Sequence, residues 1–197
     1  GCYWNAVSDD LRRKVMHRSL DLFNKEMNKN VKTYEDFQNH VTDNDLIDGA
    51  YKIGALSWEA KKIMHQARET RNIFDGHPDS SDPSLFKVLN MIADCNRYVL
   101  SQEYPIPIIN VNDYILKMDT DSYDKHDLAV EQAFVDLPEI YKGEMCNKLF
   151  TYYLSNTIST RFRANIEFSY PILWRVTPKE IRIQVGQRFD KMYLAGD

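Results

Sequence analysis

Three residues near the middle of the chain have side chains that suit phosphate chemistry. Residues 71–77 read RNIFDGH, so Asn72 directly follows Arg71, and five residues separate Arg71 from His77. A guanidinium carries a planar set of donors that matches phosphate oxygens, and an imidazole can take up or release a proton near neutral pH. The stretch is therefore either an ordinary helix end or part of an active site, and the elements that carry it bear on that choice.

The helix expected to carry Arg71 begins at Ser57. Apolar residues recur along it at intervals of three and four and share one helix face with the arginine; this stripe is Ala60, Met64, Ala67, Arg71 and Phe74. An arginine on a core-facing stripe is costly unless an anion, hydrogen-bonding partners or water meet it. One interpretation is structural, with Arg71 paired to an acidic residue of a neighbouring helix or packed at the stripe's edge. The other is that Arg71 points into a functional cleft.

Gly76 is expected to close this helix in the left-handed conformation that follows many helix C-termini. On a continuous helix His77 would lie about 120° away from Arg71 around the axis. A left-handed turn at Gly76 lets the chain fold back, so that the imidazole approaches the side toward which Arg71 points, and Pro78 fixes the exit. The alternative is that His77 is a loop residue that caps the preceding carbonyl groups.

The motif resembles the signature of the HEPN superfamily, in which an arginine is followed by a polar residue and, a short way on, by a histidine at the end of a helix in a small helical bundle. Members are typically metal-independent RNases of defence and toxin systems. The resemblance implies Arg71 and His77 as catalytic residues and Asn72 as a supporting residue of an endoribonuclease that needs no cofactor and no metal ion. It also implies an RNA substrate and a homodimer with a composite active site. An antitoxin or a fused regulatory domain would then inhibit the nuclease.

The resemblance covers residues 46–103, and two features of the chain depart from the family pattern. No tyrosine closely follows His77, as one does in some branches, and the part of the chain after the motif is longer than a minimal bundle needs. The subfamily and the role of the C-terminal part are therefore left open.

Cleavage of RNA without a metal ion uses the 2′-hydroxyl as nucleophile. One group must take the proton of that hydroxyl and another must protonate the leaving 5′-oxygen, and histidine can fill both roles. Arg71 would stabilise the charge that develops on the phosphorane, and Asn72 would orient His77 or hold a phosphate oxygen. Two copies of the motif in a dimer would supply base and acid, and the expected products are a 2′,3′-cyclic phosphate and a 5′-hydroxyl.

Composition excludes several classes of protein. The 197 residues are 43% hydrophobic and 27% charged, which suits a sizeable core and excludes a low-complexity or collagen-like chain. There is no apolar run of about 18 residues and no basic-then-apolar signal at the start, so we expect a cytoplasmic protein without a membrane span. Cys2, Cys95 and Cys146 lie far apart and favour reduced thiols over a disulfide framework or a zinc site.

Charge is distributed unevenly along the chain, whose net charge is −4. Residues 103–144 are strongly acidic, whereas residues 161–191 hold seven basic residues against three acidic ones. The basic end could contact a polyanion, although charge of this kind more often marks the solvated faces of helices.

Helical periodicity runs through nearly the whole chain, and the alternation typical of strands is scarce. The predicted fold class is all-α, a helical bundle with antiparallel long helices and a C-terminal helical extension. Two prolines exclude a helix over residues 103–110 and mark a crossover. We therefore expect an HEPN-like bundle over residues 1–104 and an extension over residues 105–197 that packs on the same core.

Polar caps, Pro at a first helical position and Gly after a last one place the single helices. The expected helices are a long one after Ser8, a short one behind the cap pair Thr33 and Asp36, one opened by Asp43 or Asp45, one from Ser57 to Gly76, one from the Asp82 cap and Pro83 to residue 102, three over residues 111–118, 127–137 and 139–156, and a last one over residues 178–194 behind the Thr177 cap. None of them covers residues 157–176.

Two other functions are compatible with the sequence. The first is a non-catalytic helical dimerisation or interaction module with an HEPN-like fold, whose acidic middle and aromatic, basic end contact partners. The second is metal-dependent phosphohydrolysis, because His126 and Asp127 resemble the central pair of an HD-type site. Such a site needs a further upstream His and a downstream Asp. His40, His65, His77 and Asp136 are candidates only because they are of the required residue types. No glycine-rich run suggests a nucleotide-binding loop.

Overall fold

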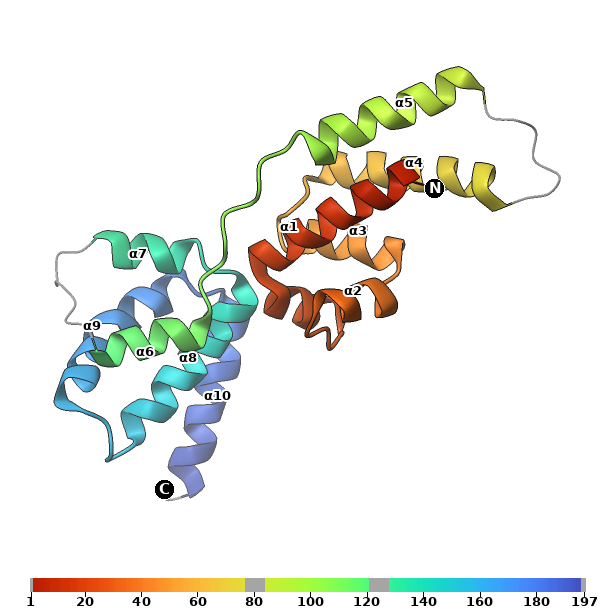
Figure 1. Ribbon diagram of the computed structural model, residues 1–197. Coiled ribbons are helices and arrows are strands. Elements are labelled where there is room, and N and C mark those ends of the chain that lie inside the picture. Colours follow the sequence, from red (N-terminus) through yellow and green to blue (C-terminus); the bar gives the residue numbers. More distant parts are fainter. Residues whose placement is uncertain (1, 77–83, 121–127, 196–197) are drawn as a thin grey trace. The chain divides into compact units, whose positions relative to one another are not determined.

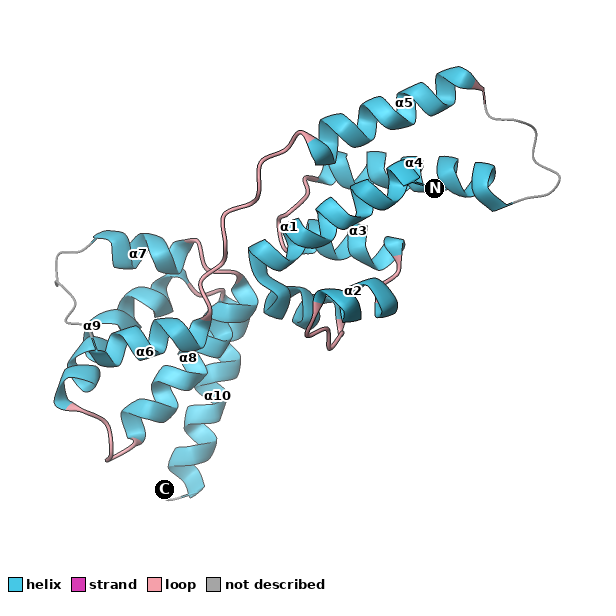
Figure 2. Ribbon diagram, in the orientation of Figure 1, coloured by secondary structure: helices cyan, strands magenta, loops and turns pink. Residues whose placement is uncertain are grey.

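The computed structural model describes residues 2–76, 84–120 and 128–195, and over these residues it contains helices and no strand (Figures 1 and 2). The predicted all-α fold class is confirmed. His77, Pro78, Asp82 and Pro83 lie outside the described residues. The position of His77 and the cap at Asp82 therefore stay predictions.

The helices follow one another as α1 (Cys2–Met27), α2 (Tyr34–His40), α3 (Asp43–Lys52), α4 (Trp58–Gly76), α5 (Leu85–Cys95), the π-helical turn η1 (Asn96–Leu100), α6 (Val111–Thr120), α7 (Leu128–Val135), α8 (Glu139–Leu154), α9 (Thr160–Val176) and α10 (Lys179–Ala195). The chain divides into two compact units, an N-terminal unit of residues 1–108 and a C-terminal unit of residues 109–197. That the C-terminal part shares a core with the first unit stays a prediction.

In the N-terminal unit, α3 packs against α1 and α4, and α4 packs against α5 (Figure 1). Its core is built from fully buried aromatic and aliphatic side chains, among them Leu11, Phe23, Phe37, Leu46, Ile47 and Met64. Gly49 on α3 makes a close approach to α1 possible, because a Cβ at this position would overlap the ring of Phe23. The absence of a side chain at Gly49 is therefore a packing requirement.

Hydrogen bonds at the starts of α2, α3 and α4 agree with the cap signals of the sequence, whereas the predicted helix start at Ser8 is wrong, because α1 begins at Cys2. Thr33 Oγ1 accepts a hydrogen bond from the backbone N–H of Asp36 at 3.1 Å, and the Asp36 carboxylate accepts one from the Thr33 N–H at 3.2 Å, which confirms the predicted capping box. Thr42 caps α3 and makes Asp43 its first residue. Ser57 Oγ accepts from the N–H of Ala60 at the start of α4.

Arg18 fastens the non-helical segment after η1 to the N-terminal unit. Its Nη1 donates to the carbonyl of Ile106 at 2.6 Å, and its own carbonyl accepts from the N–H of Ile108 at 2.8 Å. Its Nε also donates to the carbonyl of Ile53 at 2.9 Å. The next residue, Ser19, has an extended backbone (φ −179°, ψ 106°) and interrupts α1. The predicted absence of a helix over residues 103–110 is confirmed.

In the C-terminal unit, α9 packs against α6, α7 and α8, and α8 also contacts α10 (Figure 1). Phe134, Leu149 and Leu173 are buried in its core. The helix α9 is absent from the predicted set, which had no helix over residues 157–176. Ser159 caps it by accepting from the N–H of Phe162, and Pro171 lies inside it.

Candidate functional site

The helix α4 places Arg71 as the helical stripe predicts. Ala60, Met64 and Ala67 on this stripe are buried, and the side chain of Arg71 is 28% exposed. Arg71 therefore lies at the edge of the core of the N-terminal unit, with its stem packed and its guanidinium partly open to solvent.

Asp43 is the residue toward which three side chains converge. Its Oδ2 accepts from Arg71 Nη2 at 2.7 Å and from the indole N–H of Trp4 at 2.7 Å, and its Oδ1 lies 3.7 Å from Arg12 Nη2. Because Asp43 opens α3, its charge also interacts favourably with the positive end of that helix. We call Trp4, Arg12, Asp43 and Arg71 the Asp43 cluster, and it joins α1, α3 and α4.

Further contacts orient the guanidinium of Arg71. Its Nη1 donates to Asn72 Oδ1 at 3.1 Å, and its Cζ lies 5.5 Å from the centre of the Trp4 ring. Its Nε is buried and has no hydrogen-bond partner among the described residues. Arg71 is thus held by a carboxylate, an amide and an aromatic face.

The charges of the Asp43 cluster are closely balanced. Arg12 Nη1 pairs with Asp9 Oδ1 at 3.0 Å, so two guanidinium groups face two carboxylates. A phosphate at Arg71 would have to share the guanidinium with Asp43. The acidic partner on a neighbouring helix, which the structural interpretation of Arg71 expects, is therefore present, and the catalytic role of Arg71 stays a prediction.

A groove between α4 and α5 was not predicted. It has a volume of about 280 Å³, and apolar, amide, hydroxyl and charged side chains line it, among them Thr70, Phe74, Lys87, Asn90 and Asp94. Three of the α5 residues recur at three- and four-residue intervals, a polar stripe that could have been read from the sequence. Arg71 does not line this groove.

The described histidines have structural partners. His65 Nε2 lies 2.9 Å from Asp48 Oδ1, which also binds Lys61 at 2.9 Å, and His40 Nδ1 lies 3.1 Å from the carbonyl of Asp36. His126 and Asp127, the pair of the metal-dependent alternative, lie outside the described residues. Over the ranges that the structure describes, no three His, Cys, Asp or Glu side chains come together as metal ligands.

Two cysteines are free and buried, Cys95 in the N-terminal unit and Cys146 in the C-terminal unit. Burial, with the nearby charge of Asp94, raises the pKa of Cys95 to about 11, and burial raises the pKa of Cys146 although Thr177 hydrogen-bonds to its sulfur. Both thiols therefore stay protonated at neutral pH and are poor nucleophiles.

Searches with protein-family models, curated proteins and solved structures found no match to this chain. Among the described helices, none combines the length and apolar character that crossing a membrane requires.

Proposed function

We propose that the chain is a metal-independent endoribonuclease in which Arg71 and His77 act on the scissile phosphate. The observation that supports the proposal best is the state of Arg71, which is fixed by Asp43, Asn72 and Trp4 near the end of α4 while its side chain stays 28% exposed. A cation that is already oriented can stabilise developing charge without reorganising during the reaction.

In the proposed reaction, His77 takes the proton of the RNA 2′-hydroxyl, and the oxygen attacks the adjacent phosphorus. A second His77, from the other copy of a homodimer, protonates the 5′-oxygen as the bond to phosphorus breaks, which leaves a 2′,3′-cyclic phosphate and a 5′-hydroxyl. Arg71 stabilises the negative charge that develops on the phosphorane. Asn72 orients His77 or holds a phosphate oxygen. Asp43 is a positioning residue for Arg71.

The test uses purified protein, labelled single-stranded RNA and excess EDTA. We expect His77→Ala to lower the cleavage rate by about 10²-fold or more, as removal of a general acid–base does, and Arg71→Ala to lower it by a similar factor. Asn72→Ala should cost less, about 10-fold, because its role is positioning. His40→Ala and Arg68→Ala are matched controls from the same unit and should cleave like the wild type.

A modified substrate tests the use of the 2′-hydroxyl, and His77→Ala purified in parallel separates this nuclease from a contaminating RNase, which would need the same hydroxyl. An oligonucleotide with a 2′-deoxyribose at the cleavage site should resist the enzyme, because the nucleophile is missing. If the wild type and His77→Ala cleave equally, or if the wild type does not cleave RNA, the proposed activity is wrong.

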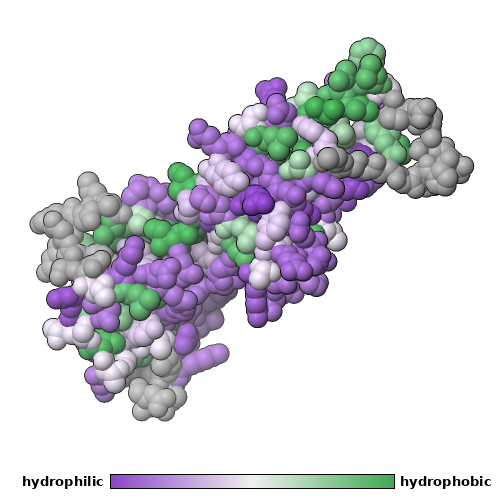
Figure 3. Space-filling model, in the orientation of Figure 1, coloured by the Kyte–Doolittle hydropathy of each residue, from purple (hydrophilic) through white to green (hydrophobic). Residues whose placement is uncertain are grey.

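A second candidate function is a non-catalytic interaction module, and the surface of α5 favours it. Leu85, Phe86, Leu89 and Ile92 on this helix are between 36% and 77% exposed, and apolar side chains gather over α5 (Figure 3). Apolar groups in such a patch mark interaction sites in many proteins. In this alternative, the Arg71–Asp43 ion pair only joins α3 and α4.

Sedimentation of the wild type and of Phe86→Asp tests the second candidate. An interaction module that associates through α5 should lose its self-association in this variant, while His77→Ala should sediment like the wild type. If the wild type and Phe86→Asp are both monomers at all concentrations, self-association through α5 is excluded.

A further inference from the structure

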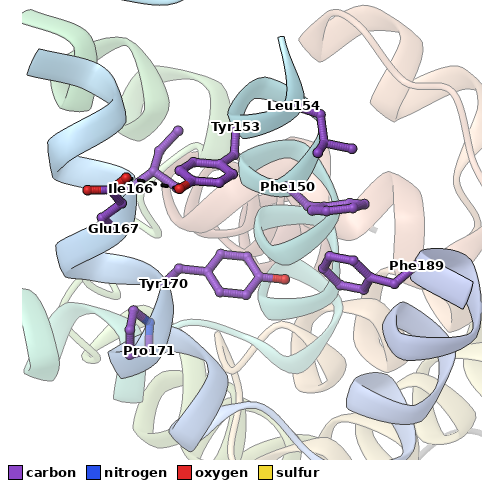
Figure 4. Close-up of a pocket in the computed structure, with 8 residues that line it drawn as sticks. All are labelled: Phe150, Tyr153, Leu154, Ile166, Glu167, Tyr170, Pro171 and Phe189. Atoms are coloured by element: carbon purple, nitrogen blue, oxygen red, sulfur yellow. Dashed lines mark hydrogen bonds between the residues drawn. The ribbon is translucent and has the colours of Figure 1, made fainter. Parts of the chain in front are cut away.

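The C-terminal unit contains an apolar cavity that no part of the proposed RNase reaction uses. It has a volume of about 370 Å³ and opens between α8, α9 and α10 (Figure 4). Its lining is almost wholly apolar and consists of Phe150, Tyr153, Leu154, Ile166, Glu167, Tyr170, Pro171 and Phe189. A concave apolar space of this size with few polar groups is typical of small-molecule sites.

Aromatic rings form half of the lining. Phe150 of α8 and Phe189 of α10 are in contact with each other, and Tyr170 of α9 directs its hydroxyl toward them (Figure 4). Tyr153 of α8 completes the set. Aromatic faces carry partial negative charge, so a group of rings favours a cation over an anion.

Glu167 is the one lining residue with an ionisable carboxyl group. Its Oε1 accepts a hydrogen bond from the Tyr153 hydroxyl at 2.9 Å, drawn as a dashed line in Figure 4. Within the described parts of the chain, no Lys, Arg or His lies within ion-pair distance of this carboxylate. Arg163, one turn earlier on α9, donates to the carbonyls of Tyr153 and Ser155, and its Cζ lies 4.9 Å from the centre of the Tyr153 ring, so it covers one face of that ring. The carboxylate is thus oriented by a neutral hydroxyl and not neutralised by a basic group.

The Tyr170 hydroxyl, which points toward Phe189 and away from Glu167, remains neutral (Figure 4). Its oxygen is buried and has no hydrogen-bond partner among the described residues. Burial raises the pKa of Tyr170 well above its ordinary value. Among the described lining residues, the negative charge therefore comes from Glu167 alone.

We propose that this cavity binds a small organic ammonium ion, whose apolar body packs between the aromatic rings and whose charge lies against the carboxylate of Glu167. Charge complementarity selects the cation, because the lining residues that the structure describes offer a carboxylate and aromatic faces and include no basic side chain. The site belongs to the C-terminal unit, and the proposal stands or falls independently of RNA cleavage by Arg71 and His77.

The probes are benzyltrimethylammonium and its uncharged carbon isostere neopentylbenzene, titrated into the full chain and followed by NMR. The ammonium ion should shift backbone signals of α8, α9 and α10 and should bind more tightly than the isostere. Glu167→Gln preserves the shape of the side chain and should weaken ammonium binding about 10-fold. Glu180→Gln, a change at an exposed carboxyl of α10 outside the cavity, should leave the affinity unchanged.

A third variant tests the location without touching charge. Leu154→Trp at the cavity rim, where Leu154 is 50% exposed, should fill the space and abolish binding while the helical circular dichroism stays that of the wild type. Equal affinity for the ammonium ion and its isostere, or wild-type affinity in Glu167→Gln, overturns the proposal. An absence of any ammonium-dependent shift in α8, α9 and α10 overturns it as well.

Discussion

Close ion pairs join α4 to α3 in the N-terminal unit, whereas in the C-terminal unit ring pairs join helices alongside polar bonds such as that of Arg188 with Asn147. In the first, Arg71 and Lys61 of α4 reach Asp43 and Asp48 of α3. In the second, the corresponding contacts are ring pairs between helices, Phe150 with Phe189, Tyr152 with Phe162, and Tyr114 with Phe134. Directional bonds hold a side chain in one orientation, as chemistry on a phosphate requires. Ring packing is less directional, and the paired rings of Phe150 and Phe189 line the apolar cavity of the C-terminal unit.

The largest difference between the units is expected for glycine substitutions at helix contacts. Gly49→Ala should destabilise the N-terminal unit by about 3 kcal/mol, because the new Cβ overlaps the buried ring of Phe23. At Gly143 in the C-terminal unit, a Cβ would lie 3.2 Å from Ile181 Cγ2, and the gain in helix propensity offsets the tighter contact, so Gly143→Ala should cost less than about 1 kcal/mol. Denaturant unfolding of both variants measures the contrast, and equal costs would contradict it.

Arg71→Ala tests whether the Asp43 cluster stabilises the fold. We expect a loss of about 2 kcal/mol in the free energy of unfolding, because Asp43, itself 21% exposed, loses a charged hydrogen bond. Arg68 is a matched control on the same helix, since its side chain is 24% exposed but its partner Glu69 is 61% exposed. Arg68→Ala should cost at most about 0.5 kcal/mol. Similar losses in the two variants would show that the cluster contributes no more than a surface ion pair.

Acid should weaken the N-terminal unit through Asp48 and Asp9. Burial alone would raise the pKa of Asp48, but hydrogen bonds and charges from Lys61 and His65 outweigh it and lower that pKa. Burial also disfavours the charged form of Asp9, but the nearby Tyr34 hydroxyl, hydrogen bonds from Gln38 and Arg12, and the charge of Arg12 outweigh it and lower the pKa of Asp9. Because the folded-state pKa values lie below the unfolded ones, this stabilisation is present above about pH 4 and is lost as the pH falls through the folded values.

Indole NMR signals can follow this acid effect in each unit, since Trp4 and Trp58 belong to the N-terminal unit and Trp174 to the C-terminal unit. The Asp48→Asn variant should lose part of the pH dependence of the Trp4 and Trp58 signals. An unchanged acid midpoint in this variant would count against Asp48 as a source of the effect.

The smallest expected effect is a gain in the stability of the C-terminal unit. Gly186 lies inside α10, and a Cβ there would meet no other atom within 4 Å in the described structure. Gly186→Ala should stabilise the C-terminal unit by about 0.5 to 1 kcal/mol, because alanine favours the helix over glycine. Thermal unfolding monitored at Trp174 measures the gain, and a lower midpoint would mean that α10 needs the glycine for another contact.

Local signals in the sequence accounted for much of the N-terminal unit. The capping box of Thr33 and Asp36 and the stripe that carries Arg71 depend on neighbours within one or two helical turns, and both are present in the structure. The partner of Arg71 could not be predicted in this way. Asp43 lies 28 positions earlier, and spacing alone does not distinguish it among 29 acidic residues.

The helix α9 shows how a local signal can mislead. Phe162, Ile166 and Leu173 are buried on one face at helical intervals, so the pattern was readable from the sequence. Pro171, however, removes a backbone donor and usually ends a helix. Packing against α6, α7 and α8 stabilises α9 in spite of the proline, and this tertiary contribution is invisible to a local reading. The cavity beside α9 was missed for the same reason, since its walls come from three helices.

The bonds of Arg18 determine where the chain can be divided without damage. A protease or a gene truncation that cuts directly after Gln102 would remove the Ile106 and Ile108 partners of Arg18 and leave its Nη1 and its carbonyl to water, while Nε keeps its bond to Ile53. A cut after Ile108 would leave these bonds in the first fragment. Fragments for separate study of RNA cleavage and ammonium binding should therefore end at Ile108 and begin at Ile109.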